Sequence, residues 1–201
     1  MKIDISKEEI ETVKECFHNK PLYNIGNYKF ILNSLTEQHP ATEAFLLKSA
    51  AKMMVKSLKS IDNCNKLLSE EDKGGILLAA ISLLTNTPFG MARWYPSSLV
   101  NQIPTMFSCE YITSKELYLT GINKKDKVII IDDIISTGGT LIGLIQSLEK
   151  IGAEILEILV LGEKIEYGGI AKIKKETSYD VKSIIEISIA SELSKVVKVK
   201  I

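Results

Sequence analysis

Apolar residues along this chain follow two alternating spacings. Residues 127–131 and 155–161 are nearly continuous apolar runs, typical of strands buried on both faces of a parallel sheet. Between them, residues 140–151 place Leu and Ile at helical spacing, and Gly152 follows as a stop signal. The order strand–helix–strand predicts an α/β fold, with a mostly parallel twisted sheet flanked by helices.

The rest of the chain extends this pattern. Further helices are predicted where apolar residues recur every three or four positions, over 7–17, 41–61 and 76–84. Further strands are predicted over 63–69, 88–93, 184–189 and 196–201. The last two alternate apolar and polar residues, as edge or interface strands do.

Residues 94–108 interrupt the periodicity. At about 15 residues, this stretch is longer than most connections in a compact domain. It contains two prolines and is rich in Ser and Asn, which predicts a mobile functional loop. Beyond it, residues 107–112 and 116–119 are predicted to pair as a hairpin around 113–115.

Composition narrows the classes of function. The 25 basic and 25 acidic side chains give a net charge of zero, so charge offers no reason to expect a nucleic-acid partner. No apolar run approaches the roughly 18 residues of a membrane span, and the charged N-terminus does not resemble a signal peptide. Cys16, Cys64 and Cys109 are too scattered for a disulfide framework or zinc site. We expect a cytoplasmic protein without membrane or nucleic-acid partners.

The most informative stretch is Val128–Thr140. Asp132 and Asp133 follow a buried strand, and their carboxylates can accept hydrogen bonds from vicinal hydroxyls. The loop after them is built of small residues and leads into a helix, so backbone N–H groups and the helix dipole can hold a phosphate there. The loop residues are Ser136, Thr137, Gly138, Gly139 and Thr140. Together these features suit a ribose 5-phosphate.

Simpler interpretations exist for each part. Two Asp residues can merely solvate a strand end, and Gly138-Gly139 alone is a turn signal. If the strand and its two Asp residues were the Walker B strand of a P-loop NTPase, the chain would also need G-x-x-x-x-G-K-[ST]. A dinucleotide-binding site would need G-x-G-x-x-G. Neither pattern occurs in the chain.

The combined motif resembles the phosphoribosyl-pyrophosphate (PRPP) motif of type I phosphoribosyltransferases. That pattern has four apolar residues, two acids, two apolar residues, a small residue and Thr-Gly-Gly-Thr, with Ser136 here at the small position. The resemblance spans roughly residues 65 to 165. It implies one domain over 1–201 with a small hood and a flexible loop. Its expected parts are a helical N-terminal part with hood elements, a PRPP-binding core and C-terminal strands, over 1–62, 63–165 and 166–201.

Two further segments are similar to adenine phosphoribosyltransferases. The acidic turn before residues 76–84 and the end of the strand over 88–93 resemble the family's pyrophosphate-binding region. The resemblance implies that pyrophosphate is bound by Glu71, Asp72, Lys73, Gly74 and Arg93. Lys73 stands where the family has Arg, which keeps the charge but loses the bidentate fork. Trp94 stands where the family usually has Lys.

The loop 94–108 corresponds to the family's flexible catalytic loop, and Glu110 to its candidate general acid or base. A surface hairpin Glu is the competing interpretation. A closing loop suits the chemistry, because water would capture an oxocarbenium-like ribosyl cation. Catalytic roles are thereby implied for Glu110, Asp132 and Asp133, with Mg²⁺ held by PRPP and water.

The purine base is not fixed by the sequence. Phe30 lies in the nearest equivalent of the adenine enzymes' Phe-Arg-Asp element, but the Arg-Asp pair is missing. Archaeal hypoxanthine/guanine enzymes share patterns seen at Leu117–Ile122 and Glu176–Lys182. The first hypothesis is transfer of the phosphoribosyl group from PRPP to adenine, giving AMP and pyrophosphate, by a homodimer. The alternatives are a hypoxanthine/guanine enzyme and a non-catalytic PRPP-sensing regulator.

Overall fold

The structure, a computed structural model, describes residues 3–96, 103–109 and 112–201. The helices are α1 (Lys7–Phe17), α2 (Ala44–Ser57), α3 (Gly74–Thr85), α4 (Gly139–Ile151) and α5 (Gly169–Thr177), with 3₁₀ turns η1 (Ile61–Asn63) and η2 (Ile165–Tyr167). The strands are β1 (Leu22–Ile25), β2 (Tyr28–Ile31), β3 (Lys66–Glu70), β4 (Phe89–Arg93), β5 (Ile103–Cys109), β6 (Ile112–Thr120), β7 (Lys127–Ile135), β8 (Glu154–Lys164), β9 (Lys182–Ser188) and β10 (Lys195–Val199).

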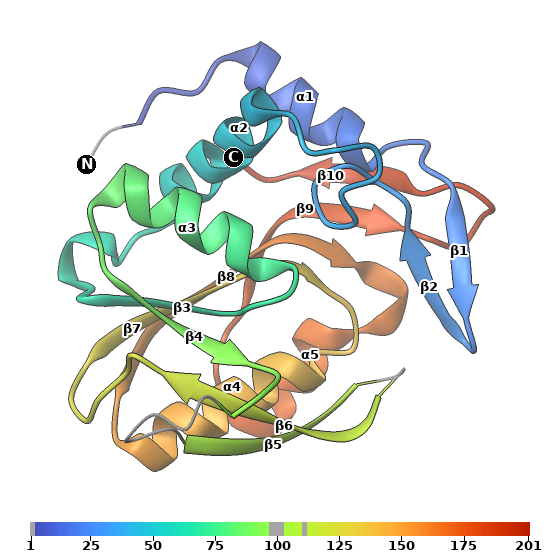
Figure 1. Ribbon diagram of the computed structural model, residues 1–201. Helices are drawn as coiled ribbons and strands as arrows, with labels where there is room; N and C mark the ends of the chain where they lie inside the picture. Colours follow the sequence, from blue (N-terminus) through green and yellow to red (C-terminus); the bar gives the residue numbers. More distant parts are fainter. Residues whose placement is uncertain (1–2, 97–102, 110–111) are drawn as a thin grey trace.

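The described strands form one eight-stranded sheet in the order β10-β9-β8-β7-β3-β4-β6-β5 (Figure 1). Strands β9, β8, β7, β3 and β4 run parallel to their neighbours, while β10, β6 and β5 are added in antiparallel fashion. The order of successive strands reverses between β7 and β3: β4 follows β3 on one side, whereas β8 and β9 follow β7 on the other. The prediction of a mostly parallel sheet is confirmed.

Helices cover both faces of the sheet because its central strands are apolar on both sides. Ile129 and Ile131 of β7 pack into a core with α1, α2 and α3. Val128 and Ile130, the alternate residues, pack into a second core with α4 and α5. All four are fully buried, so β7 is the kind of strand that the apolar run predicts.

A separate two-stranded sheet stands beside this sandwich. Strands β1 and β2 pair antiparallel around the Gly26-Asn27 turn, and Figure 1 shows the hairpin projecting at one side of the molecule. No strands were predicted here, because the stretch from Pro21 to Asn27 contains Pro, Asn and Gly, which favour turns. The hairpin is the small hood of the expected fold.

Several boundaries differ from the predictions. Strand β7 continues to Ile135 instead of ending at 131, because β8 is long enough to pair with it as far as Glu163. Strand β5 covers residues 103–109 and so begins inside the stretch expected to be an irregular loop, well before the strand predicted from 107; its partner β6 begins at Ile112. The predicted turn at 113–115 is therefore wrong, since these residues lie within β6. Helix α5 was not predicted.

Candidate functional site

A cleft opens between β7 and β3, where the order of successive strands in the sheet reverses. It lies at the carboxyl ends of β3 and β7, the position where ligands bind in open α/β sheets. Side chains from both strands, the β3–α3 loop, the hood and β8 line it: Tyr28, Ile31, Thr36, Glu37, Glu70, Asp72, Lys73, Trp94, Asp132, Asp133, Ile134, Thr140 and Lys164. The space within and at the mouth of this open cleft amounts to about 560 Å³, part of which is bulk solvent.

Asp132 and Asp133 form the acidic floor of the cleft. They are only 7% and 6% exposed, and the backbone N–H of Asp133 donates to Asp132 Oδ1 at 3.0 Å. Burial raises the pKa of both carboxyls, and Glu70 nearby adds to the increase. The pKa of Asp133 reaches about 7, against the opposing effect of Lys73 and Lys164. Such carboxylates are suited to accept hydroxyl hydrogen bonds, which lower the cost of holding buried charge.

A second hollow adjoins the first at the start of α4. It is lined by the predicted phosphate loop together with the end of β7 and the hood: Tyr28, Asp132, Ile134, Ile135, Ser136, Thr137, Gly138, Gly139, Thr140 and Leu141. Gly138 has φ +82°, a conformation that favours glycine. Helix α5 also approaches closely here, because a Cβ on Gly169 would lie 2.1 Å from the carbonyl oxygen of Ser136. The loop lies at the N-terminus of α4, where backbone N–H groups and the helix dipole suit an anion.

The β3–α3 loop is shaped by the buried carboxylate of Glu70. This side chain accepts hydrogen bonds from the backbone N–H groups of Asp72 at 2.9 Å, Lys73 at 2.7 Å and Gly74 at 3.2 Å. Gly74 packs against the acidic floor: a Cβ there would lie 2.8 Å from Asp132 Oδ1. The loop and the acidic pair are thus built as one unit.

Lys73 reaches into the cleft, as the resemblance implies. Its ammonium pairs with Glu37 of the loop between β2 and α2, and lies 4.7 Å from the centre of the Phe30 ring. Phe30 itself is 6% exposed and stacks on Tyr23 at 5.0 Å between ring centres, so it is a packing residue here.

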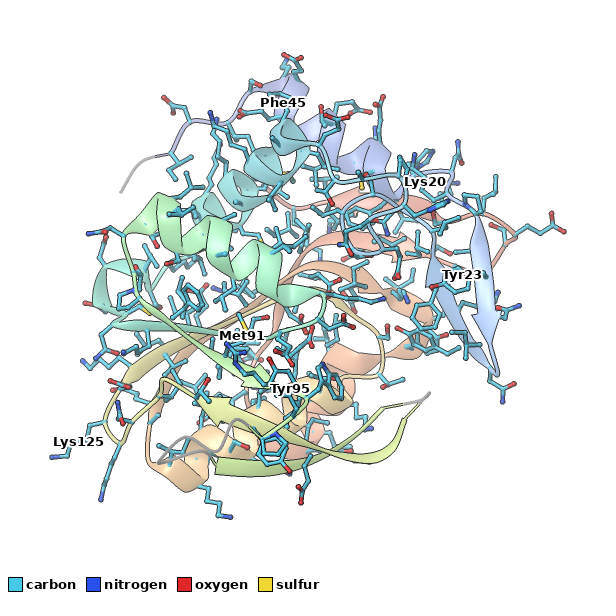
Figure 2. All side chains as sticks on the ribbon, in the orientation of Figure 1. Lys20, Tyr23, Phe45, Met91, Tyr95 and Lys125 are labelled. Carbon is cyan, nitrogen blue, oxygen red and sulfur yellow. The ribbon has the colours of Figure 1, made fainter. Side chains whose placement is uncertain are left out.

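The structure does not bring Arg93 and Glu71 into the lining of the cleft. Arg93 Nη1 donates to the hydroxyl of Tyr95 at 2.9 Å and lies 3.8 Å from Glu71 Oε2. Glu71 in turn accepts a hydrogen bond from the backbone N–H of Trp94 at 2.8 Å. Figure 2 shows Tyr95 beyond the end of β4. The other implied catalytic residue, Glu110, lies outside the described residues.

Sequence reasoning missed two central residues of the cleft. Lys164, at the end of β8, is 3% exposed and donates to the hydroxyl of Tyr28 at 3.0 Å and the carbonyl oxygen of Lys29 at 2.7 Å. Tyr28, on β2, lines both hollows. A lysine that ends a long apolar strand is the signal that could have pointed to Lys164. No local signal marks Tyr28.

The described residues also bear on two other classes of function, metal binding and membrane insertion. They contain no cluster of three or more His, Cys, Asp or Glu side chains arranged to hold a metal ion. Nor does any helix among them have the length and apolarity needed to cross a membrane.

Comparison with solved structures places this architecture among the type I phosphoribosyltransferases. The adenine phosphoribosyltransferase of Thermoanaerobacter pseudethanolicus superimposes with a TM-score of 0.73 at 21% identity, covering 88% of this chain and 99% of that one. The adenine enzyme of Rhodothermus marinus gives 0.72 at 21% identity, covering 90% and 99%. At this level of identity the likeness shows the fold.

Sequence comparison then gives the family. The model of the phosphoribosyl transferase domain matches residues 89–194. The hypoxanthine/guanine phosphoribosyltransferase of Methanocaldococcus vulcanius is 37% identical over 180 residues, covering 89% of this chain and 93% of that protein. The protein of the same name from Methanothermococcus okinawensis is 35% identical over 182 residues, covering 90% and 94%. The chain belongs to the phosphoribosyltransferase family, a class of PRPP-dependent glycosyltransferases.

Proposed function

We propose that this protein transfers the phosphoribosyl group of PRPP to a 6-oxopurine, hypoxanthine or guanine, and releases pyrophosphate. The observation that carries the choice of base is the ammonium group of Lys164, buried in the same cleft as Asp132 and Asp133. An ammonium only donates hydrogen bonds, so it matches the oxygen at position 6 of these bases. The 6-amino group of adenine is itself a donor and is a poor partner for it.

The comparisons support the same choice. The relatives with 35–37% identity over about nine-tenths of the chain are named hypoxanthine/guanine enzymes. The two adenine enzymes compared above are only 21% identical to this chain, so their likeness shows the fold alone. Adenine, the first hypothesis from the sequence, becomes the second candidate.

In this proposal each part of the cleft holds one part of PRPP. Asp132 and Asp133 accept hydrogen bonds from the ribose hydroxyls, and the loop from Ser136 to Thr140 holds the 5-phosphate. Lys73 exchanges its Glu37 partner for the departing pyrophosphate. The bond from ribose C1 to pyrophosphate breaks, a bond to the purine nitrogen forms, and that nitrogen loses its proton. Glu110 remains the proposed acceptor of this proton.

Magnesium enters the proposal with the substrate. Mg²⁺ dehydrates reluctantly and usually binds through substrate phosphates, waters and one or two carboxylates. PRPP and water would hold the ion, and bound Mg²⁺ would supply charge neutralisation of pyrophosphate. Positioning and leaving-group stabilisation are then the sources of rate, and no protein nucleophile is needed.

The test is a pyrophosphate-release assay with PRPP, Mg²⁺ and a panel of bases: hypoxanthine, guanine, xanthine, adenine, uracil and orotate. We expect kcat/KM for hypoxanthine or guanine to exceed that for adenine by at least about 100-fold, because a site built for one hydrogen-bonding pattern rejects its opposite strongly. Preference for adenine would overturn the choice of base. PRPP binding without turnover of any base would favour the sensing regulator.

A further inference from the structure

The hydroxyl of Tyr28 lies at the junction of the two hollows of the site. Tyr28 belongs to the hood strand β2, yet it lines both the carboxylate cleft and the hollow of the phosphate loop. It is 8% exposed, so its hydroxyl is placed by protein contacts rather than by solvent.

Two hydrogen bonds join this hydroxyl to the two ends of the site. Lys164 Nζ donates to it at 3.0 Å, and Ser136 Oγ lies 2.6 Å from it. Both partners are buried, at 3% and 8% exposure. A continuous chain of polar groups therefore runs from the ammonium in the carboxylate cleft, through the hood, to the first residue of the phosphate loop.

When an anion is bound, the hydrogen bonds that join Lys164, Tyr28 and Ser136 all have the same donor-to-acceptor direction. An ammonium can only donate, so the Tyr28 oxygen accepts from Lys164. A phosphate in the loop accepts the Ser136 hydroxyl proton, which leaves Ser136 Oγ to accept from Tyr28. Every bond then points from the cation to the anion, and hydrogen bonds in such a chain polarise and strengthen one another.

The ring of Tyr28 is held in place by packing contacts. It packs edge-on against Phe30, with 4.5 Å between ring centres, and stacks on Tyr167 at 5.3 Å. The ammonium of Lys164 lies 4.3 Å from its centre. These contacts fix the ring without using its hydroxyl, so the hydroxyl can be removed while the packing stays.

We propose that Tyr28 is a positioning residue that couples base binding at Lys164 to 5-phosphate binding at Ser136. The proposal rests on the proposed function, which places the purine at Lys164. A base that draws Lys164 into place aligns Tyr28 and hence Ser136, so the two ligands bind with positive cooperativity. By linkage, each ligand raises the affinity for the other by the same factor.

The experiment is calorimetry on the full chain with ribose 5-phosphate, with and without saturating hypoxanthine. These probes do not react with each other, so binding alone is measured. In the wild type we expect hypoxanthine to raise the affinity for ribose 5-phosphate by about fivefold, within the usual range of coupling. In Tyr28→Phe we expect this factor to fall to about one, and ribose 5-phosphate to bind about tenfold more weakly without base.

The matched control is Tyr23→Phe. Tyr23 is on the neighbouring hood strand, packs on the same Phe30, and is absent from the lining of both hollows (Figure 2). Its variant should keep the wild-type coupling factor. Ser136→Ala removes the hydrogen bond at the other end of this row of polar groups and should also abolish coupling. It therefore keeps the test available if Tyr28→Phe folds poorly. In the Ser136→Ala background, Tyr28→Phe should change ribose 5-phosphate affinity less than twofold.

An unchanged coupling factor in Tyr28→Phe would overturn the proposal, even if both affinities fell. Equal effects of Tyr28→Phe in the wild-type and Ser136→Ala backgrounds would do the same. Failure of the proposed function looks different: the wild type would then turn over neither hypoxanthine nor guanine with PRPP. Turnover by the wild type together with unaltered coupling in the variant would refute only the role of Tyr28.

Discussion

Single residues in this cleft are in environments that the unfolded chain cannot provide. Asp132 and Asp133 give up hydration and lie beside Glu70, which raises the pKa of both. The native carboxyl of Asp133 holds its proton up to about pH 7, whereas an unfolded Asp releases it near pH 4. Native stability is therefore lost as the pH rises between these values. This is the cost of a site that is completed only by its ligand.

Asp133→Asn should separate function from stability. Without a carboxylate to accept a ribose hydroxyl, we expect turnover to fall by about 100-fold or more, with the circular dichroism spectrum unchanged. Asn does not ionise, so the variant escapes the loss of stability that the wild type suffers as the pH rises. The difference in unfolding free energy, variant minus wild type, should therefore be about 2 kcal/mol larger at pH 8 than at pH 5. Denaturant unfolding at the two pH values measures this. Asp180→Asn is the control, because Asp180 is 82% exposed and pairs with Lys174 only at the surface. Wild-type activity in Asp133→Asn would show that turnover does not need the Asp133 carboxylate.

Lys164→Met should act on the choice of base. The substitution keeps the length and apolar stem of the side chain but removes all of its donors. We expect kcat/KM for hypoxanthine to fall by about 100-fold and the ratio of hypoxanthine to adenine to fall with it. Lys174→Met, at an exposed lysine of α5, should leave both values unchanged. A loss shared equally by hypoxanthine and adenine would assign Lys164 to packing instead.

At the scale of elements, the site depends on how β3 meets α3. Glu70 closes the loop by accepting from three backbone N–H groups, and α3 then begins at two consecutive glycines. The two glycines have different surroundings. A Cβ on Gly74 would lie 2.0 Å from Ser69 Oγ, whereas one on Gly75 would meet its nearest atoms at 3.6 Å.

The pair Gly74→Ala and Gly75→Ala tests this difference. Gly74→Ala must displace Ser69 or Asp132, so we expect a stability loss of about 1–3 kcal/mol and at least a tenfold rise in KM for PRPP. Gly75→Ala has room, and replacing glycine in a helix should add up to about 1 kcal/mol of stability without changing the kinetics. Thermal unfolding and PRPP titration measure both. Similar behaviour of the two variants would contradict the close packing of Gly74 on the acidic floor.

At the scale of the whole molecule, α3 covers the sheet with an unusual composition. It contains no charged residue, although it has a solvent-facing side. Leu83 on that side is 86% exposed, more than any other large apolar side chain among the described residues. Helices that are apolar all round are normally buried. We therefore propose that the expected homodimer forms through α3, rather than through the C-terminal strands, of which β9 is interior and only β10 is an edge.

Leu83→Glu tests this proposed interface, and we expect the variant to be monomeric where the wild type is dimeric. The position is exposed within one chain, so the fold should persist, whereas a charge buried between two copies costs several kcal/mol. Sedimentation equilibrium measures the mass. Leu193→Glu, at a leucine 44% exposed in the turn before β10, should leave the dimer intact. A dimer that survives Leu83→Glu would exclude the α3 face.

The sequence alone determined the parts of this protein whose physics is local. The apolar run before Asp132, the glycine-rich loop and the helix after it specify strand, turn and helix, and the structure confirms all three elements. That the turn binds an anion stays a prediction. The alternation of strands and helices predicted the parallel sheet, because apolar faces must be covered on both sides. The short segments were predicted least well: each strand of the hood hairpin has four residues, and α5 has nine.

Only the tertiary structure decided which side chains meet. Tyr28 is 136 residues from Lys164 and 108 from Ser136 along the chain, yet its hydroxyl contacts both. Arg93, which the resemblance implies binds pyrophosphate, contacts Tyr95 and Glu71. Local patterns encode backbone conformation and burial, whereas the partners of a buried polar group depend on how distant elements pack. The phosphate loop could therefore be predicted from the sequence, while the group proposed to select the base became visible only when β8 and the hood came together.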